Sequence, residues 1–425
     1  MKAFIRKIEE IRPISGRDRI QEALVQGCWT MVSKESKVGG IGVFFEVDGI
    51  IDESFLFENS LYADKEKNKD KNLKGYFPNN GRIRALKFSF GMSNGMFMGL
   101  DSLKYLNVDL SKFKENQDIS TFKLRDGKDF ILVVKYEPQE TSVQSEFSEK
   151  KTSFFPEHLD TEHFFRNRPH LPVGSRVIIT NKMHGTSARY GNLPKWNIKG
   201  IWGKVLRYFP FYWKRYVGTR RVQLKRGELG WHGSNEFRYE ILNEMDIPKG
   251  YAIYGEIVGY ANGKPIMSLH DGSQMGKDFE KKFGKDITYN YGCKAGEFKF
   301  YVYRVTRLNE ENIPFDLPYA EMVQFCKSHG LKTPMLLKEF VVTDAREIQD
   351  FVKQEIEKYE DPQFPEIPRE GVVVRVENDG ELSLYKEKTF AFKVHFRKDI
   401  NKKSKESISQ ISKYQKYVLC SVHKT

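Results

Sequence analysis

The sequence predicts an α+β protein in which a small β-barrel at the N-terminus precedes a domain built around an antiparallel sheet. Residues 1 to about 135 alternate short apolar runs with Gly, Asn and charged turns, at the spacing of a small barrel or sandwich. Beyond a polar stretch, strand-like runs are mixed with helical ones. The 425 residues are enough for two or three domains, each with its own core.

The N-terminal region is predicted to contain little helix. Its charged stretch at residues 64–74 (DKEKNKDKNLK) has no apolar face, which is typical of a solvated loop. The expected strands are AFIRKI, GCWTMVSK, GIGVFFEV, IRALKFSF, GMFMGL and DFILVVKY.

A domain boundary is expected within residues 137–151 (EPQETSVQSEFSEKK), because this stretch is polar and poor in apolar residues. The predicted domains are therefore 1–140 and 152–400, followed by a basic C-terminal tail at 401–425 in which a terminal helix is conceivable. In the second domain the strand-like runs are RVIITNKM, YAIYGEIVGY, FKFYVYRV and GVVVRVE, and the helical ones are YAEMVQFCKSHG and AREIQDFVKQEIEKY.

The charge balance favours a polyanionic partner. The formal net charge is +13 and the sequence pI is about 9.2, and Lys and Arg that meet phosphates release condensed counterions on binding. Nucleic acid is the first expectation, with a merely basic soluble protein as the alternative.

The cysteines and the hydropathy pattern indicate a soluble intracellular protein. Cys28, Cys293, Cys326 and Cys420 have no close spacing of the kind used for zinc or redox motifs. No segment approaches the roughly 18 apolar residues of a membrane span. In a prokaryotic or viral setting the expected location is cytoplasmic.

The most distinctive local feature is the segment Lys182-Met-His-Gly185-Thr-Ser, where a β-like run passes into a turn. A lysine in that position can face a pocket and act as a nucleophile, and Gly185 lets the backbone turn tightly or approach a ligand. K-x-x-G alone is a weak pattern that is more typical of a structural surface lysine.

Two carboxylates follow at the ends of apolar strands. Glu256 stands between two glycines in YGEIVG, and Glu370 precedes a glycine in EGVVVR. Brought near a nucleotide, both can hold Mg²⁺ through its water shell, because this ion prefers oxygen ligands. Each acid alone is better explained as a solvated carboxylate at a strand end.

Lys386 and Lys388 lie on one face of a strand by its period of two, so both can meet the same phosphate group. The alternative for a single K-x-K is a charged edge strand protected from aggregation.

Together these segments resemble the ordered signatures of the covalent nucleotidyltransferase superfamily of DNA ligases, RNA ligases and capping enzymes. Those signatures are K-x-x-G, a G-E strand, an aromatic-rich strand, E-G-[VIL]-V and K-x-K. All five occur here in order, over about residues 154–397, at Lys182, Glu256, the run Phe300 to Tyr303, Glu370, and Lys386 with Lys388.

Further details resemble RNA ligases. His184 stands where DNA ligases usually carry Asp, and Gly218-Thr-Arg220-Arg221 is similar to an extra arginine motif of RNA ligases. The N-terminal segment resembles the OB-type module of the Naegleria- and Deinococcus-type RNA ligases that seal nicks. This likeness extends the resemblance to nearly the whole chain.

The resemblance implies an ATP-dependent ligase in which Lys182 takes AMP from ATP through a phosphoramidate bond. Lys386 and Lys388 would then stabilise the α-phosphate, while Glu256 and Glu370 support Mg²⁺ or Mn²⁺ through its water shell. AMP passes to a 5′-phosphate end, and a 3′-hydroxyl displaces it, with nicks carrying RNA on the 3′-hydroxyl side as the expected substrate.

The remaining assignments also rest on the resemblance. Tyr303 is expected to stack on adenine, with Phe300 as second choice. Arg221, then Arg220, are expected to bind AMP or the 5′-phosphate, and Arg189 is a weaker candidate. The OB-type module offers basic and aromatic residues for RNA contact, namely Arg17, Arg19, Trp29, Lys34, Arg82 and Lys87.

Three alternatives stay open at the level of sequence. A DNA ligase or a capping-type guanylyltransferase shares the five motifs, but both place the OB fold after the catalytic domain. A nucleic-acid-binding protein that has lost catalysis is the third, and the intact lysines and glutamates argue against it. The expected oligomeric state is a monomer.

Overall fold

The computed structural model describes residues 2–88, 90–136, 152–167, 171–198, 200–227, 229–230, 233–267, 269–378 and 380–395. Its chain divides into two compact units, which comprise residues 2–136 with 393–395 and residues 152–392 of this described part. The predicted boundary at 137–151 and the basic tail at 401–425 lie outside the described residues.

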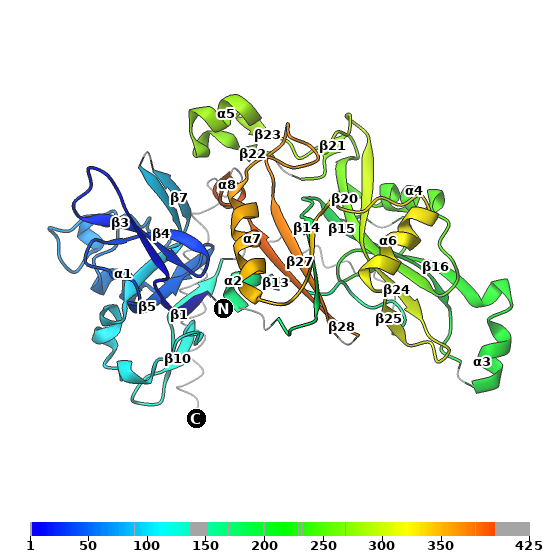
Figure 1. Cartoon of the computed structure of the whole chain (residues 1–425), viewed down its shortest axis with the longest axis horizontal. Coiled ribbons are helices and arrows are strands. Elements are labelled where there is room, and N and C mark those ends of the chain that lie inside the picture. Colours follow the sequence, from blue (N-terminus) through cyan, green and yellow to red (C-terminus); the bar gives the residue numbers. More distant parts are fainter. Residues whose placement is uncertain are drawn as a thin grey trace. The chain divides into compact units, whose positions relative to one another are not determined.

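The first unit consists of small antiparallel sheets around two apolar clusters (Figure 1). Its larger sheets have the orders β1-β5-β9 and β2-β3-β4, and β6-β12, β7-β8 and β10-β11 form pairs. The strands are β1 (Ala3–Lys7), β2 (Glu10–Pro13), β3 (Ile20–Val25), β4 (Cys28–Ser33), β5 (Ile41–Phe45), β6 (Gly49–Ile51), β7 (Ala85–Phe88), β8 (Gly91–Asn94), β9 (Met96–Gly99), β10 (Thr121–Lys123), β11 (Asp129–Ile131) and β12 (Val133–Lys135).

Strand β5 shows why this unit has two clusters. Val43 and Phe45 point into one apolar cluster, and Phe44 between them points into the other. Successive side chains of a strand face opposite sides, so one buried strand serves both clusters.

Helical structure in the first unit is short. Helix α1 begins after Asp52, whose carboxylate accepts hydrogen bonds from the N–H groups of Ser54 (2.9 Å) and Phe55 (3.2 Å). The charged run at 64–74 is exposed except for Asn68, whose side chain binds the backbone of Tyr62. The helices are α1 (Glu53–Glu58) and the 3₁₀ turns η1 (Lys65–Lys67), η2 (Leu100–Leu106) and η3 (Leu110–Lys112).

One predicted strand of this unit is divided. The run DFILVVKY forms β11, which pairs with β10, and β12, which pairs with β6. Leu132 between them is fully buried. Because the apolar pattern is continuous, it did not indicate that the pairing strand changes from β10 to β6.

The second unit is built on two sheets. The first has the order β13-β28-β27-β14-β26 and is antiparallel except at β13-β28, and the second has the order β17-β16-β15-β20-β24-β25 with β21 beside β20. The strands are β13 (Glu162–His163), β14 (Arg176–Asn181), β15 (Thr186–Pro194), β16 (Trp213–Gly218), β17 (Gln223–Leu224), β18 (Leu229–Gly230), β19 (Gly233–Ser234), β20 (Tyr251–Ala261), β21 (Lys264–Pro265), β22 (His270–Asp271), β23 (Asp286–Ile287), β24 (Phe298–Leu308), β25 (Pro314–Asp316), β26 (Leu336–Val341), β27 (Gly371–Asn378) and β28 (Glu381–Lys388).

The described residues of this unit also form short helices between the strands. They are α2 (Phe164–Asn167), α3 (Gly200–Leu206), α4 (Glu236–Glu244), α5 (Lys277–Phe283), α6 (Tyr319–Ser328), α7 (Ala345–Glu357) and α8 (Phe390–His395), with the 3₁₀ turns η4 (Pro210–Tyr212) and η5 (Gly272–Met275). Among the described residues, no helix combines the length and the apolar character needed to cross a membrane.

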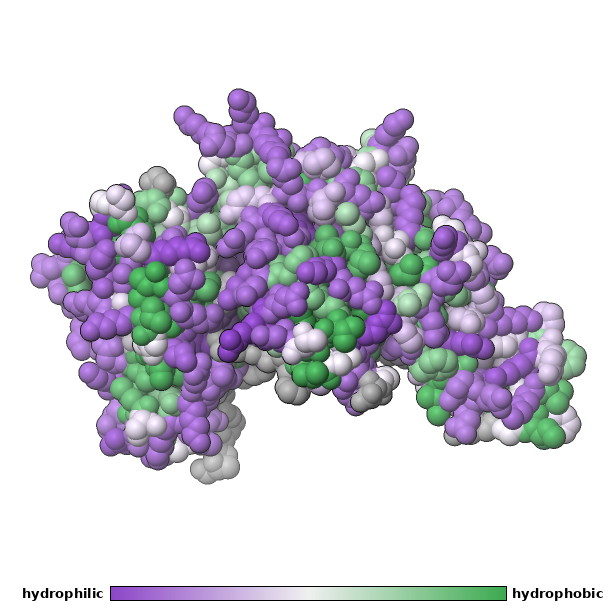
Figure 2. All heavy atoms as spheres, in the orientation of Figure 1, coloured by the Kyte–Doolittle hydropathy of each residue, from purple (hydrophilic) through white to green (hydrophobic). Residues whose placement is uncertain are grey.

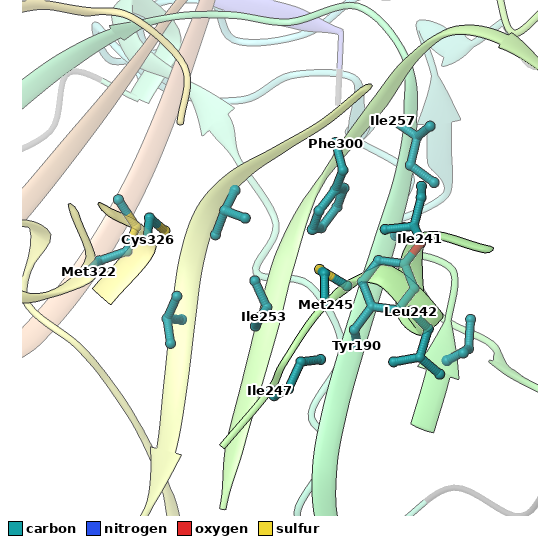
Figure 3. Close-up of a cluster of buried hydrophobic side chains, with 14 of the residues drawn as sticks. Tyr190, Ile241, Leu242, Met245, Ile247, Ile253, Ile257, Phe300, Met322 and Cys326 are labelled. Carbon is teal, nitrogen blue, oxygen red and sulfur yellow. The ribbon is translucent and has the colours of Figure 1, made fainter. Parts of the chain in front are cut away.

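Each sheet has its own apolar cluster. Helices α4 and α6 pack against β15, β20 and β24, where Figure 3 shows Ile241, Met322 and Ile253 among the buried side chains. Helix α7 buries Ile348 and Val352, one turn apart, against β14 and β27. A further apolar cluster, with Phe155, Tyr216 and Tyr254, packs on the other face of the second sheet.

Candidate active site

A cavity of about 250 Å³ lies between the two sheets of the second unit. The polar residues that line it include Lys182 at the end of β14, Ser187, Arg220, Glu256, Tyr303, Arg304, Arg375, Lys386 and Lys388, together with His158 and Thr161 from the segment before β13. Most of the residues predicted for catalysis therefore meet in one place.

Lys182 lies where β14 ends, as the sequence predicted. Its N–H donates to the carbonyl of Gly371 (3.0 Å), which fixes it beside the start of β27. Its Nζ lies 2.9 Å from Oε1 of Glu370, and Lys388 Nζ lies 3.1 Å from the same oxygen. One carboxylate thus holds two ammonium groups at the cavity.

The charge state of Glu370 is set by those neighbours. Burial raises the pKa of this carboxyl, but the opposing charges of Lys182 and Lys388 and the nearby His184 outweigh burial and hold its pKa at about 2. Glu370 is consequently an anion at neutral pH. With such a pKa it is a weak base, suited to holding cations rather than protons.

His184, the departure from the usual Asp, is buried behind Glu370. Its Nδ1 lies 3.7 Å from Oε2 of Glu370 and its Nε2 lies 3.4 Å from Nε2 of His270. Burial lowers the pKa of both histidines, that of His270 to about 4. Both rings are therefore neutral near pH 7, and their aromatic neighbours Tyr289 and Phe392 pack edge-on against His184.

Glu256 differs from its predicted place at a strand end. It lies inside β20, which continues to Ala261. The flanking Gly255 marks a close approach instead of an end, because a Cβ there would lie 2.3 Å from the carbonyl oxygen of Tyr301.

The carboxylate of Glu256 accepts a hydrogen bond from Ser187 Oγ (3.2 Å). Burial raises its pKa to about 7, opposed by Lys182 and reinforced by Glu370. Glu256 is therefore less acidic than Glu370.

Gly185, like Gly255, allows two backbone segments to approach closely. A Cβ on this residue would lie 2.1 Å from the carbonyl oxygen of Ile257 in β20. The turn after Lys182 can therefore pass against β20 only with glycine at this position.

Lys386 and Lys388 both face the cavity, as the period of two predicted. Strand β28 lies between β13 and β27, so it is no edge strand. Burial, Lys182, Lys388 and Arg220 together lower the pKa of Lys386 to about 8.

This pKa predicts a pH dependence of phosphate binding. Below about pH 8 the free protein carries a charged Lys386 that attracts phosphate, and above it the side chain is neutral. Calorimetric affinity for pyrophosphate should fall as the pH rises through 8. In Lys386→Arg that fall should disappear, because arginine stays charged; an identical pH profile in the variant would contradict the assignment.

The arginine motif is placed differently from the prediction. Arg220, the second choice, lines the cavity, and its Nη2 lies 2.5 Å from Oδ1 of Asp160. Arg221, the first choice, is exposed and is not among the residues that line the cavity. Arg189 is buried and donates to the carbonyls of Phe155 (2.9 Å) and Pro156 (2.6 Å), so it supports the segment before β13.

The two aromatic residues predicted to contact adenine lie in different places. Tyr303 lines the cavity, and its hydroxyl lies 2.6 Å from Nδ1 of His158. Phe300 belongs to the apolar cluster of the β15–β20–β24 sheet and packs edge-on against Tyr190. Of these two residues, Tyr303 lines the cavity and Phe300 does not.

A buried polar network behind the lysine was not predicted. Asn181 donates to Asp361 (2.7 Å) and accepts from Arg369 Nε (3.1 Å), and Arg369 also pairs with Glu355 (2.7 Å). Asn181 and Arg369 directly precede Lys182 and Glu370. No local pattern marks these residues, because their partners come from distant segments.

In the first unit, the residues predicted to contact RNA are of two kinds. Arg17 lies over the ring of Phe90 and Arg12 over that of Trp29, with Arg19, Lys34 and Lys87 exposed. Arg82, in contrast, is buried and pairs with Asp48 (2.6 Å), so it has a structural partner.

Family models match the two units of the chain separately. A sequence model of the RNA ligase family matches residues 175–395, slightly more than half of the chain. The chain belongs to the RNA ligase family. This RNA ligase is an enzyme with a nucleic-acid substrate, and a model of an OB-fold domain matches its residues 2–100. Both matches confirm the predicted fold class.

Solved structures similar to this RNA ligase come from Naegleria gruberi. Its RNA ligase with pyrophosphate has a TM-score of 0.54 and 20% identity over 92% of this chain and 97% of that chain. A lysine-to-alanine mutant of it with ATP and Mn gives a TM-score of 0.55 and 18% identity over 92% and 98%. Such identities establish a common fold. No curated protein sequence matches the chain.

Proposed function

We propose that this RNA ligase uses ATP and works through an AMP group held on Lys182. The observation that carries the proposal is the placement of Lys182 Nζ, 2.9 Å from Glu370 and in one cavity with Lys386 and Lys388. A nucleophile backed by an anion and faced by two further cations suits attack on a phosphate. The Naegleria enzyme, with the same fold, has been solved with ATP and with AMP.

In the first step, the free amine of Lys182 attacks the α-phosphorus of ATP. An N–P bond forms, the bond from phosphorus to the pyrophosphate oxygen breaks, and the amine loses its remaining extra proton. Glu370 positions the amine, and Lys386 and Lys388 offset the charge that gathers on the α-phosphate. Tyr303 is proposed to contact adenine and Glu256 the ribose or the metal shell.

The donor set fits a hard divalent cation held mainly by phosphates and water. Among the described residues no group of three or more His, Cys, Asp or Glu side chains could hold a metal ion directly. Glu370 is anionic and its Oε2 accepts no hydrogen bond from the described residues, and Glu256 lines the cavity beside it. Mg²⁺ or Mn²⁺ bound there supplies neutralisation of phosphate charge.

The later steps use the nucleic acid. AMP passes from Lys182 to a 5′-phosphate, for which Arg220 at the cavity is the proposed partner, and a 3′-hydroxyl then displaces AMP to form the phosphodiester. We propose nicks with RNA on the 3′-hydroxyl side as the substrate, contacted by the OB-fold unit through Arg17, Trp29 and Lys87. The proposed state is an intracellular monomer with domains 1–140 and 152–400.

The test is transfer of label from ATP marked at the α-phosphate. Wild-type protein with Mg²⁺ should retain acid-labile label after denaturation, and Lys182→Arg, which keeps the charge but stays protonated, should retain none. If the protein retains label from GTP or NAD and not from ATP, that nucleotide would take the place of ATP in the proposal. A folded wild type that keeps no label from any of the three would refute it.

A further inference from the structure

The connection between β15 and β16 forms an arm, defined here as residues 195–212, that has no role in the chemistry above. It contains α3 and η4, and Figure 1 shows α3 standing away from the two sheets of its unit. The cavity lies at the other end of the same hairpin, where Ser187 in β15 and Arg220 after β16 line it.

Polar groups fix the arm to the body of the unit. Arg207 donates through Nη2 to the carbonyls of Asn309 (2.9 Å) and Glu310 (2.8 Å) and to Oδ1 of Asn312 (2.6 Å). Lys204 Nζ, one turn earlier, lies 2.9 Å from Glu310. Tyr212 at the base is fully buried and donates to the carbonyl of Trp196 (3.0 Å). The arm is therefore held in a set position.

This attachment reverses the usual orientation of a surface helix, which buries its apolar stripe. Here the apolar side chains face outward: Ile201, Trp202 and Tyr208 are 74%, 71% and 85% exposed. Figure 2 shows hydrophobic atoms over this region at the lower right. The exposed set continues with Trp196, Val205, Phe209 and Phe211, of which the last two stack at 5.4 Å.

An exposed apolar set of this size marks an interaction site, and the surrounding charge indicates the partner. Residues 195–215, which are the arm and the first residues of β16, contain six Lys and Arg and neither Asp nor Glu. Lys195 on the arm is exposed and lies over the ring of Trp196. Most of the exposed set is aromatic. Aromatic faces next to cations are what single-stranded nucleic acid binds, by base stacking and phosphate attraction.

We propose that the arm binds unpaired RNA bases at a fixed distance from the joining site. Ser187 and Pro194 are seven residues apart in β15, or about 24 Å at 3.4 Å per residue. That span corresponds to roughly seven stacked nucleotides at about 3.4 Å each. The arm would thus favour RNA ends in which the bases more than about seven nucleotides from the joining site are unpaired. This proposal rests on the RNA substrate of the family.

The test compares Trp202→Ala/Tyr208→Ala with Val173→Ala/Val341→Ala, in which two other exposed apolar side chains of the same unit are shortened (79% and 62% exposed). Fluorescence anisotropy with a labelled single-stranded RNA of about 20 nucleotides should show affinity lowered about tenfold or more in the arm variant only. With an RNA of about five nucleotides, wild type and arm variant should bind alike.

Lysyl-adenylate formation from ATP should be unchanged in both variants, so failure of the ligase proposal and failure of this one are separable. Equal affinity of arm variant and wild type for the longer RNA would overturn the inference. It would also be overturned if the arm substitutions left RNA binding intact but abolished binding to vesicles of anionic phospholipid, or abolished a concentration-dependent dimer in sedimentation. Those results would assign the surface to a membrane or to a second copy.

Discussion

Replacing Glu370 by glutamine should slow formation of the lysyl-adenylate by about 10²- to 10³-fold, the usual consequence of losing one preorganised electrostatic group. Lys182 and Lys388 both lie within about 3 Å of Oε1, at 2.9 and 3.1 Å. Glutamine keeps the shape but removes the charge that holds the two ammonium groups together. The nucleophile would then lose its fixed position relative to the α-phosphate.

The measurement is the single-turnover rate of label transfer from ATP at saturating Mg²⁺. Glu339→Gln is the matched control, since Glu339 is a half-exposed carboxylate on β26 that pairs with Arg176 away from the cavity. A Glu370→Gln rate within twofold of wild type would show that the carboxylate has no part in positioning Lys182.

Replacing Arg369 by methionine should lower the free energy of unfolding by about 3 kcal/mol, because the buried carboxylate of Glu355 then keeps only the exposed Lys358 as its cationic partner. The side chains of Arg369 and Glu355 are 1% and 7% exposed, and their ion pair measures 2.7 Å. Arg369 also donates to Asn181, the neighbour of Lys182. Adenylylation should therefore weaken together with stability.

Urea-induced unfolding measures the effect. The control is Arg176→Met, which removes an exposed pair on the neighbouring strand β14 and should cost at most about 1 kcal/mol. Adding Glu355→Gln to Arg369→Met should restore part of the loss, since the buried negative charge that lost its buried partner is then gone. Equal costs for the two arginine substitutions would disprove a special role for the buried network.

The chemistry of this site could be predicted where it depends on residue order along one strand. Lys386 and Lys388 face the cavity because side chains alternate along β28, and Lys182 follows β14 because its apolar run ends there. The meaning of a glycine within a strand-like run could not be predicted in the same way. In YGEIVG it was interpreted as the end of a strand, whereas Gly255 admits a neighbouring carbonyl and leaves β20 unbroken.

Contacts between distant segments could not be predicted from local pattern. Arg220 and Arg221 are adjacent and chemically alike, and only the geometry of the turn after β16 brings Arg220 to the cavity. Phe300 and Tyr303 lie in one aromatic run, but Phe300 packs in the apolar cluster behind the sheet. His158 carries no motif, and it reaches Tyr303 because its segment crosses β24.

The reacting lysine and its carboxylate are remote in sequence but adjacent in the sheet. Lys182 follows β14 and Glu370 precedes β27, and these strands pair directly, with Asn181 opposite Val372. The long stretch of chain between these two strands does not interrupt their pairing. Segments such as the arm can accordingly be lengthened, exchanged or removed at their exposed ends while the distance between nucleophile and anion stays set by two hydrogen-bonded neighbours. The fold thus keeps the nucleophile and its anion together independently of the exposed connections.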